Sequence, residues 1–215
     1  MIDKIERLST TAYAVLGLLA LDSWTAYELK QQAQRSLHFC WPKADTILYA
    51  QPRKLEALGL ARSEVEVHNG RRRNRYWITP KGREALSRWL ASPSGPPQLE
   101  LEPVLRLLFA DQGTLDDAKS AIDAMRQWAI DRALDGKSIL DSYGTAEEPF
   151  PDRRHLKLLT SVFYASIGEA ILEAAEFATA EIQRWEASGG TEPSAQLQTR
   201  IHDAARRLGR VVEHS

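Results

Sequence analysis

The stretch VEVHNGRRRNRYWITPKG, residues 65–82, limits the possible folds of this 215-residue chain more than any other segment. It begins with alternating valine and glutamate and continues, at residues 76–78, with aromatic and β-branched residues, so it predicts two short strands. The Asn69-Gly70 pair between them supplies the positive φ angles that a tight hairpin requires. Thr79 and Pro80 then have the residue types of an N-cap and a first helical position. The stretch therefore predicts a two-stranded ribbon that leads directly into a helix.

Three consecutive arginines, Arg71, Arg72 and Arg73, follow the predicted turn. Neighbouring like charges repel each other, so this run contributes nothing to the stability of the hairpin. At a hairpin tip the arginines would lie far from any core, and guanidinium groups bind phosphate oxygens well. The run therefore favours a ribbon that contacts a phosphate backbone over the alternative, a merely solvated loop.

Three helices are predicted before the ribbon, at residues 10–21, 25–37 and 44–59. The second begins with the spacing of a capping box, from Thr25 to Glu28. The ribbon and a fourth helix follow, up to the proline-rich segment ASPSGPP, which prevents a continuous helix. Three helices, a two-stranded ribbon and a further helix are typical of a winged helix-turn-helix.

The second half of the chain has a helical pattern throughout. A capping box at Thr114 to Asp117 begins one helix, which runs to about Leu140, and a longer helix is predicted at residues 153–187. Both carry apolar stripes, but the segment offers little other core, so we expect these helices to pack on each other and on a second subunit. The predicted dimer contacts on the longer helix are Leu156, Leu159, Phe163, Ile167 and Phe177.

Charge is unevenly distributed along the chain. Residues 1–92 hold 15 Lys and Arg against 9 Asp and Glu, whereas residues 93–215 hold 13 against 20. This asymmetry indicates a module that binds a polyanion, joined to a module with another role.

Cysteine content and hydropathy indicate the compartment. Cys40 is the only cysteine, so an internal disulfide is impossible and a reducing cytoplasm is expected. We interpret Cys40 as a small buried hydrophobe, with a redox sensor as the alternative. No run reaches the roughly 18 apolar residues of a membrane span, and the N-terminus lacks the pattern of a signal peptide. A cytoplasmic protein without a membrane partner is predicted.

In a helix-turn-helix, the third helix buries one face in the core and presents the other to a DNA groove. Leu48, Leu55 and Leu58 would form the buried face. Two alternatives to DNA contact are packing of Tyr49 on a neighbouring helix and a purely solubilising role for Arg53 and Lys54. The predicted DNA contacts are Lys43, Thr46, Tyr49, Arg53 and Lys54 around this helix and Arg71, Arg72, Arg73 and Arg75 on the ribbon.

Five segments together resemble the PadR family of winged-helix transcriptional regulators: TAYAVLGLLAL, TAYELKQQ, FCWP, LYAQPRKLEALGLA and NGRRRNRYWITPKGREAL. The helical remainder resembles the subgroup with a long C-terminal dimerisation domain. The resemblance implies a dimeric cytosolic DNA-binding regulator, usually a repressor, which a small molecule such as a phenolic compound releases. Two residues depart from the family pattern. Ala26 stands where a glycine is common, and Pro52 should kink or split the third helix near Leu48.

The predicted fold class is mainly α: a winged helix-turn-helix with a two-stranded β-hairpin wing, then an all-α dimerisation domain of long helices. The predicted division is residues 1–92 for the DNA-binding domain, 93–97 for a linker, 98–190 for the helical dimerisation and effector domain, and 191–215 for a C-terminal tail with a short helix.

The sequence leaves two functional hypotheses. The first is a homodimeric transcriptional repressor that binds a palindromic operator and responds to a small aromatic effector, with an activator as a variant. The second is a protein-interaction or ligand-sensing module without DNA readout.

An enzyme is not expected, because the chain has no phosphate-binding glycine loop, GxSxG or HExxH. The five histidines lack metal-ligand spacing, so neither a metal nor another cofactor is predicted. Aromatic residues are interpreted as core or dimer contacts, with an effector pocket as the alternative for Trp41, Trp77, Trp89, Trp128 and Trp185.

Overall fold

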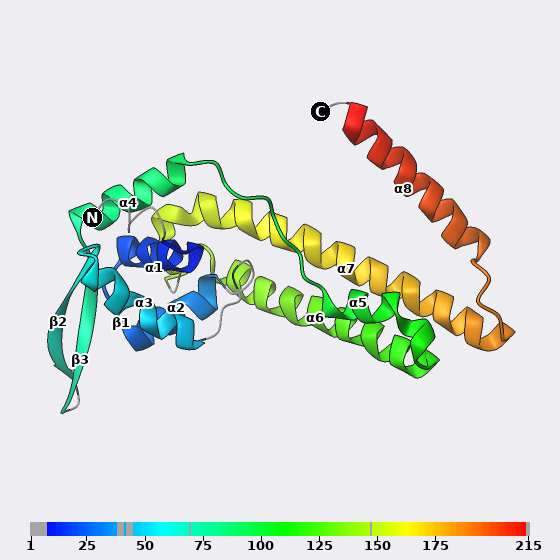
Figure 1. The fold of residues 1–215 in the computed structure, drawn as a ribbon, viewed down its shortest axis with the longest axis horizontal. Coiled ribbons are helices and arrows are strands. Elements are labelled where there is room, and N and C mark those ends of the chain that lie inside the picture. The colour runs from blue at the N-terminus through cyan, green and yellow to red at the C-terminus, as the bar shows by residue number, and fades with distance from the viewer. Residues whose placement is uncertain (1–7, 38–40, 42–44, 69, 147, 214–215) are drawn as a thin grey trace. The chain divides into compact units, whose positions relative to one another are not determined.

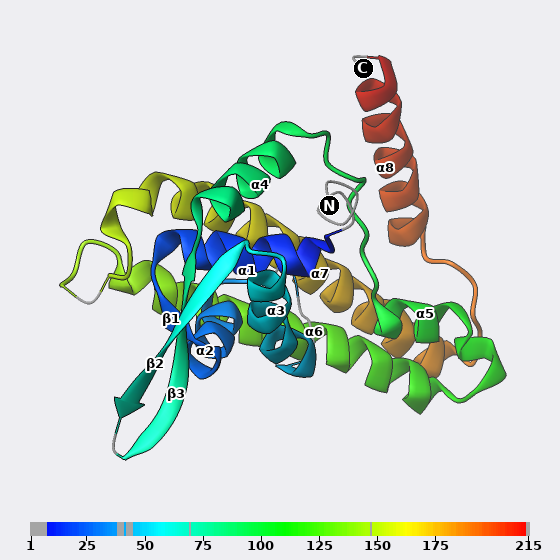
Figure 2. The same cartoon turned by 60° about the vertical axis from the view of Figure 1, so that its left-hand side comes forward.

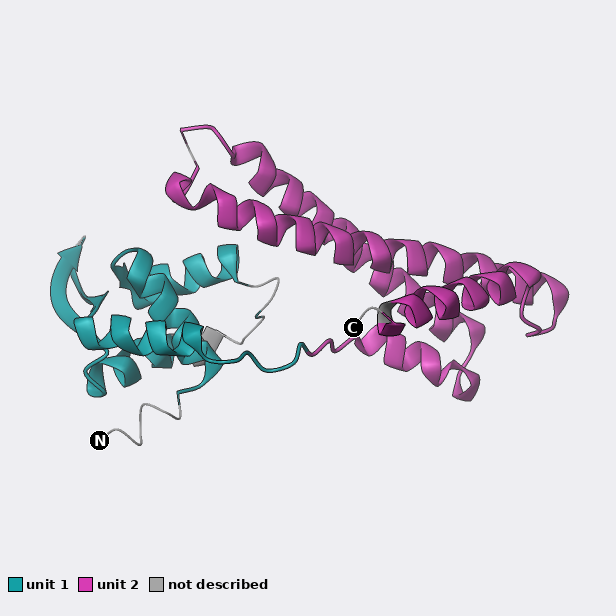
Figure 3. Ribbon diagram, turned by 90° about the horizontal axis from the view of Figure 1, so that it is seen from above, with its two compact units in different colours: residues 1–97 teal, residues 98–215 magenta. Residues whose placement is uncertain are grey.

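The structure of the chain is a computed structural model that describes all residues except 1–7, 38–40, 42–44, 69, 147 and 214–215 (Figure 1). It consists of two compact units, residues 1–97 and 98–215 (Figure 3). Most described residues are helical, and a small antiparallel sheet lies in the first unit. The predicted fold class is therefore confirmed.

The first unit contains four helices and a three-stranded sheet. The helices are α1 (Thr10–Leu21), α2 (Ala26–Ser36), α3 (Asp45–Ala57) and α4 (Pro80–Ala91), and the strands are β1 (Trp24–Thr25), β2 (Ala61–His68) and β3 (Arg71–Ile78). The sheet order is β1-β3-β2, and both pairings are antiparallel. Figure 2 shows the β2–β3 ribbon extending well beyond the helices of its own unit.

The sheet differs from the predicted two-stranded ribbon by one strand. Trp24 pairs with Tyr76 and Thr25 pairs with Arg75, so the short link between α1 and α2 becomes the edge strand β1. Trp24 also donates a hydrogen bond from Nε1 to the Leu18 carbonyl oxygen over 3.1 Å. Two residues carry no strand pattern of their own, and β1 exists because α1 and α2 hold this link beside β3.

The core of the first unit packs all four helices against the sheet. Its apolar side chains include Val15, Leu16, Leu19, Leu29, Leu55, Leu60, Tyr76 and Ala85. The predicted helix starts are confirmed: Thr25 and Glu28 form both bonds of a capping box, and Thr79 caps α4 by accepting from Gly82 N over 3.1 Å. Local hydrogen bonds thus set where α2 and α4 begin, and apolar burial holds them together.

Of the two effects predicted for Pro52, a kink or a split of the third helix, the split is wrong, because α3 continues through Pro52 from Asp45 to Ala57. Proline lacks the N–H that would donate to the Leu48 carbonyl, so α3 forgoes one hydrogen bond. The Pro52 ring is fully buried, as is Leu55 three residues on. Burial of this ring offsets the missing bond.

The second unit is a helical hairpin with two further helices. Its helices are α5 (Glu102–Leu108), α6 (Leu115–Ser142), α7 (Arg154–Ser188) and α8 (Ala195–Glu213), with 3-10 turns at Ala110–Gln112 and Pro151–Arg153. The two long helices lie side by side in opposite directions (Figure 1). The predicted capping box at Thr114 begins α6. The seven-residue α5 was not predicted, and α8, at 19 residues, is longer than the predicted short helix.

Small side chains let α6 and α7 approach closely. Ala118 and Ala129 on α6 and Ala175 on α7 are buried, together with Ile122, Met125, Ile171 and Ile182.

Within the described residues, Pro151–Ser188 is long and apolar enough to cross a membrane by length and composition. One such helix is weak evidence of a span, and the part of α7 from Ile167 to Trp185 packs in the core with α6.

Candidate nucleic-acid interface

The outward face of α3 carries the first group of predicted DNA contacts. Arg53 and Lys54 are exposed, and Tyr49 is 40% exposed, whereas Leu55 on the opposite face is fully buried. Lys43 lies outside the described residues; Thr46 belongs to α3, but its side chain is outside the described part. Lys30 Nζ of α2 lies 5.9 Å from the centroid of the Tyr49 ring. Tyr49 therefore contacts a neighbouring helix and remains accessible.

The β2–β3 ribbon separates its four arginines into two pairs. Arg71 and Arg72 are exposed at the tip and have no ion-pair partner among the described residues. The turn beside them is tight, and Gly70 has a φ of 73°. Successive side chains on a strand point to opposite faces, so Arg71 and Arg72 extend on different sides of the ribbon.

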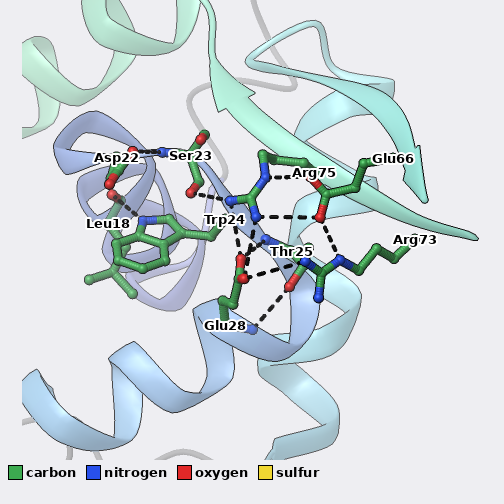
Figure 4. A network of polar contacts seen from close by, with 9 residues as sticks. All are labelled: Leu18, Asp22, Ser23, Trp24, Thr25, Glu28, Glu66, Arg73 and Arg75. Atoms are coloured by element: carbon green, nitrogen blue, oxygen red, sulfur yellow. Dashed lines mark hydrogen bonds and ion pairs between the residues drawn. The ribbon is translucent and has the colours of Figure 1, made fainter. Parts of the chain in front are cut away.

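Arg73 and Arg75, in contrast, lie in a polar cluster at the root of the ribbon (Figure 4). Arg75 donates from Nε to Glu66 Oε2 over 2.7 Å and from Nη1 to the Ser23 carbonyl over 2.8 Å. Its Nη1 also lies 3.1 Å from Glu28 Oε2. Arg73 donates from Nε to Glu66 Oε1. We call Glu28, Glu66, Arg73 and Arg75 the wing-root cluster.

Electrostatics in the wing-root cluster favour the charged forms of its members. The pKa of Glu66 is lowered, chiefly by the hydrogen bond from Arg75, and the same bond is the main cause that raises the pKa of Arg75. For Glu28, burial acts to raise the pKa, but the Thr25 backbone and Arg75 outweigh it and the net shift is downward. The side chains are 23–34% exposed, so water still screens these pairs.

The sequence did not identify Glu28, Glu66 or Ser23 as members of this site. One signal was available: with Asn69-Gly70 at the turn, the hairpin register places Glu66 directly opposite Arg73, as the structure has it. The contacts of Arg75 with Glu28 and with Ser23 span 47 and 52 residues of sequence, and no local pattern indicates them.

The predicted dimer residues of α7 fall into two groups. Leu156, Leu159 and Phe163 are exposed, at 44%, 70% and 61%. Ile167 packs against the core of the second unit, and Phe177 is half-buried, with the Arg200 guanidinium 4.7 Å from its ring centroid. Three of the five residues therefore form an accessible apolar surface at the start of α7.

Most of the tryptophans make contacts within their own unit. Trp89 stacks on Tyr13 with ring centroids 4.9 Å apart, and the Arg62 guanidinium lies 4.7 Å from the Trp77 ring. Trp41 donates from Nε1 to Thr11 Oγ1 over 3.0 Å. Trp185 packs against the α6–α7 core, and Trp128 is 43% exposed. Cys40 lies outside the described residues.

The fold and the basic ribbon define the class: a winged-helix protein with a helical second unit. Residues 15–88 match the Transcriptional regulator PadR-like family. The chain is 29% identical over 85 residues to the probable transcriptional regulator Rv1176c of Mycobacterium tuberculosis. The aligned residues cover 39% of this chain and 45% of that protein. The chain thus spans under half the length of this curated relative.

Solved structures share the fold over most of the chain. Smu.1604c from Streptococcus mutans matches with a TM-score of 0.70 and 21% identity, over 80% of this chain and 99% of its own. Bacillus subtilis PadR in complex with operator DNA matches with a TM-score of 0.64 and 18% identity, over 81% of this chain and 99% of its own. The same B. subtilis protein in complex with p-coumaric acid matches with a TM-score of 0.55, 20% identity, and coverage of 80% and 97%. The family match over residues 15–88 confirms the resemblance to the PadR family inferred from the sequence, and the solved structures show the shared fold.

Proposed function

We propose that this chain is a sequence-specific DNA-binding transcriptional regulator that acts as a homodimeric repressor. One observation carries the proposal: exposed Arg71 and Arg72 stand at the tip of the ribbon, in a winged-helix unit whose α3 presents exposed Arg53 and Lys54. Helix α3 would lie in the major groove and the ribbon tip on the flanking backbone. Support comes from the fold, which operator-bound B. subtilis PadR shares.

Two winged helices would read a palindromic operator. In a dimer the second units would hold the two α3 helices about one DNA turn, ~34 Å, apart. The exposed apolar surface of Leu156, Leu159 and Phe163 on α7 supports contact between two copies. Dimerisation through this surface belongs to the same proposal.

A small aromatic molecule would release the repressor. The support is that B. subtilis PadR, which shares the fold, was solved with p-coumaric acid. Binding of such an effector and binding of DNA would oppose each other by a coupling free energy of about 1–3 kcal/mol. Titration with p-coumaric acid against the DNA complex would measure this coupling directly.

Salt-dependent DNA binding is the primary test. Fluorescence anisotropy with the duplex upstream of the chain's own gene should give an affinity that falls steeply with salt. Replacing both Arg71 and Arg72 with Ala should lower the slope of log K against log salt by about 2 per subunit, since each phosphate contact contributes ~0.9. Lys137→Ala, which removes an exposed cation of α6, is the control and should leave the slope unchanged.

The alternative is a winged-helix module that binds a protein or senses a ligand without reading DNA. One observation supports this alternative: Glu66 and Glu28 neutralise Arg73 and Arg75, two of the four ribbon arginines. Failure of the wild-type protein to bind any duplex at low salt would support this alternative and contradict the proposed regulator.

A further inference from the structure

We propose that Glu66 restrains DNA binding: it holds Arg73 and Arg75 at the root of the ribbon, where they position the wing instead of contacting phosphates. This inference rests on the proposed function and gives a role in it to an acidic residue that was not among the predicted DNA contacts. Arg73 and Arg75 then act as positioning residues. Arg71 and Arg72 would carry the phosphate contacts of the ribbon.

The contacts of the wing-root cluster join four separate segments. Glu66 lies on β2, the two arginines on β3, Glu28 on the first turn of α2, and Ser23 in the link between α1 and β1. Arg75 is bonded to all three of its partners at 2.7–3.1 Å. A planar guanidinium held from three sides has one orientation, so the cluster fixes the base of the ribbon on α2.

The cluster also determines how much positive charge the ribbon offers to DNA. Two carboxylates face two guanidinium groups, so the wing root is neutral overall. A phosphate that approached Arg73 would have to compete with Glu66, which occupies the Nε of both arginines. A DNA backbone carries closely spaced charges of the same sign as Glu66, which would repel it near the wing root.

Glu66→Gln removes the charge while keeping the size of the side chain. We expect this variant to bind non-specific DNA at least about threefold more tightly, with a salt slope steeper by about 1 per subunit, because one guanidinium becomes available to phosphate. The ratio of specific to non-specific affinity should fall. Arg75→Ala should lower the ratio of specific to non-specific affinity. Arg75→Lys should lower it as well, because lysine keeps the charge but lacks the planar guanidinium that binds several partners at once.

Glu64→Gln is the matched control. Glu64 lies on the same face of β2, and its ion pair is with Arg62, outside the cluster. If Glu64→Gln and Glu66→Gln steepen the salt slope equally, net charge alone explains the effect and the proposal is wrong. Hydrogen exchange measured without DNA tests the positioning role separately from the proposed function. Glu66→Gln should speed amide exchange at residues 72–75, and Glu64→Gln should not. Equal exchange in both variants would overturn the positioning role even if the protein binds no DNA.

Discussion

At the scale of single residues, Gly82 explains how α4 can follow the ribbon without a loop. A Cβ at this position would lie 2.1 Å from the Leu60 carbonyl oxygen and 2.8 Å from Ile78 Cγ1. The Gly82 amide also donates to Thr79 Oγ1, the N-cap of α4. The first turn of α4 therefore lies directly on the start of β2, in a space that only a hydrogen atom fits.

Gly82→Ala should lower the free energy of unfolding by about 1–3 kcal/mol, the usual cost of overpacking, because the contacting oxygen belongs to the backbone. Gly17→Ala in α1 is the control. A Cβ there meets nothing within 4 Å, so the change should be neutral or stabilise by up to about 1 kcal/mol through helix propensity. Urea unfolding of both variants measures the difference, and equal effects would contradict the close contact at Leu60.

Glu148 is a second residue whose environment has a measurable consequence. Its buried side chain accepts from Arg154 Nε over 2.9 Å, from Lys157 Nζ over 2.7 Å and from Gly144 N over 2.9 Å. These bonds, above all the one from Arg154, lower its pKa from 4.5 to about 2. The carboxylate thus ties the loop between α6 and α7 to the first turns of α7.

Because the pKa of Glu148 is lower in the folded state, its stabilising effect is complete above about pH 4.5 and is lost as the pH falls towards 2. Urea unfolding between pH 7 and pH 2.5 should show this loss in the wild-type protein. Glu148→Gln should be less stable at pH 7 and should lose less stability on acidification. Glu176→Gln, at an exposed position of α7, should retain the wild-type acid dependence. An unchanged acid dependence in Glu148→Gln would contradict the proposed role of this carboxylate.

At the scale of elements, side-chain caps determine where helices begin. Thr25, Thr79 and Thr114 are N-caps, and in each case the hydroxyl accepts a hydrogen bond from the amide three residues later. These starts could be predicted because both partners of each bond lie within one turn of the chain. Helix α5 has no side-chain cap bond at Leu101 and is seven residues long, so no such signal was available.

Thr114→Ala should destabilise the second unit by about 1 kcal/mol, since the first turn of α6 loses the hydroxyl that accepts from Asp117 N over 3.2 Å. Thr114→Ser keeps the oxygen and should retain most of the stability. Thermal unfolding followed by circular dichroism compares the two. If serine destabilises as much as alanine, the methyl group rather than the cap would be responsible.

At the scale of the whole molecule, the chain joins two units that each have their own buried core. Residues 93–101 between them form neither helix nor strand, and nearly all are exposed. Three prolines and a glycine in this stretch disfavour a helix. Each unit can therefore keep its fold when the connection is cut.

Brief digestion with thermolysin should first cut at Leu99, which is 71% exposed in the connecting segment, and should release two resistant fragments. Mass spectrometry identifies the cut, and circular dichroism of the nicked protein should retain its helical signal. Leu99→Gly with Leu101→Gly should slow the first cut. Initial cleavage inside either core would contradict two independently folded units.

Local chemistry in the sequence was enough to determine the helix caps, the β2–β3 hairpin, the long α6 and α7, and the exposed basic tip of the ribbon. Each of these depends on residues within a few positions of one another or on a repeating pattern. Only the tertiary structure decided that Trp24 and Thr25 form a strand, that α3 continues through Pro52, and that Arg75 binds Glu28 and Ser23. The strand and the Arg75 contacts depend on how α1 and α2 pack on β3, and the continuity of α3 depends on burial of the Pro52 ring. Such long-range contacts have no signature in the residues next to them.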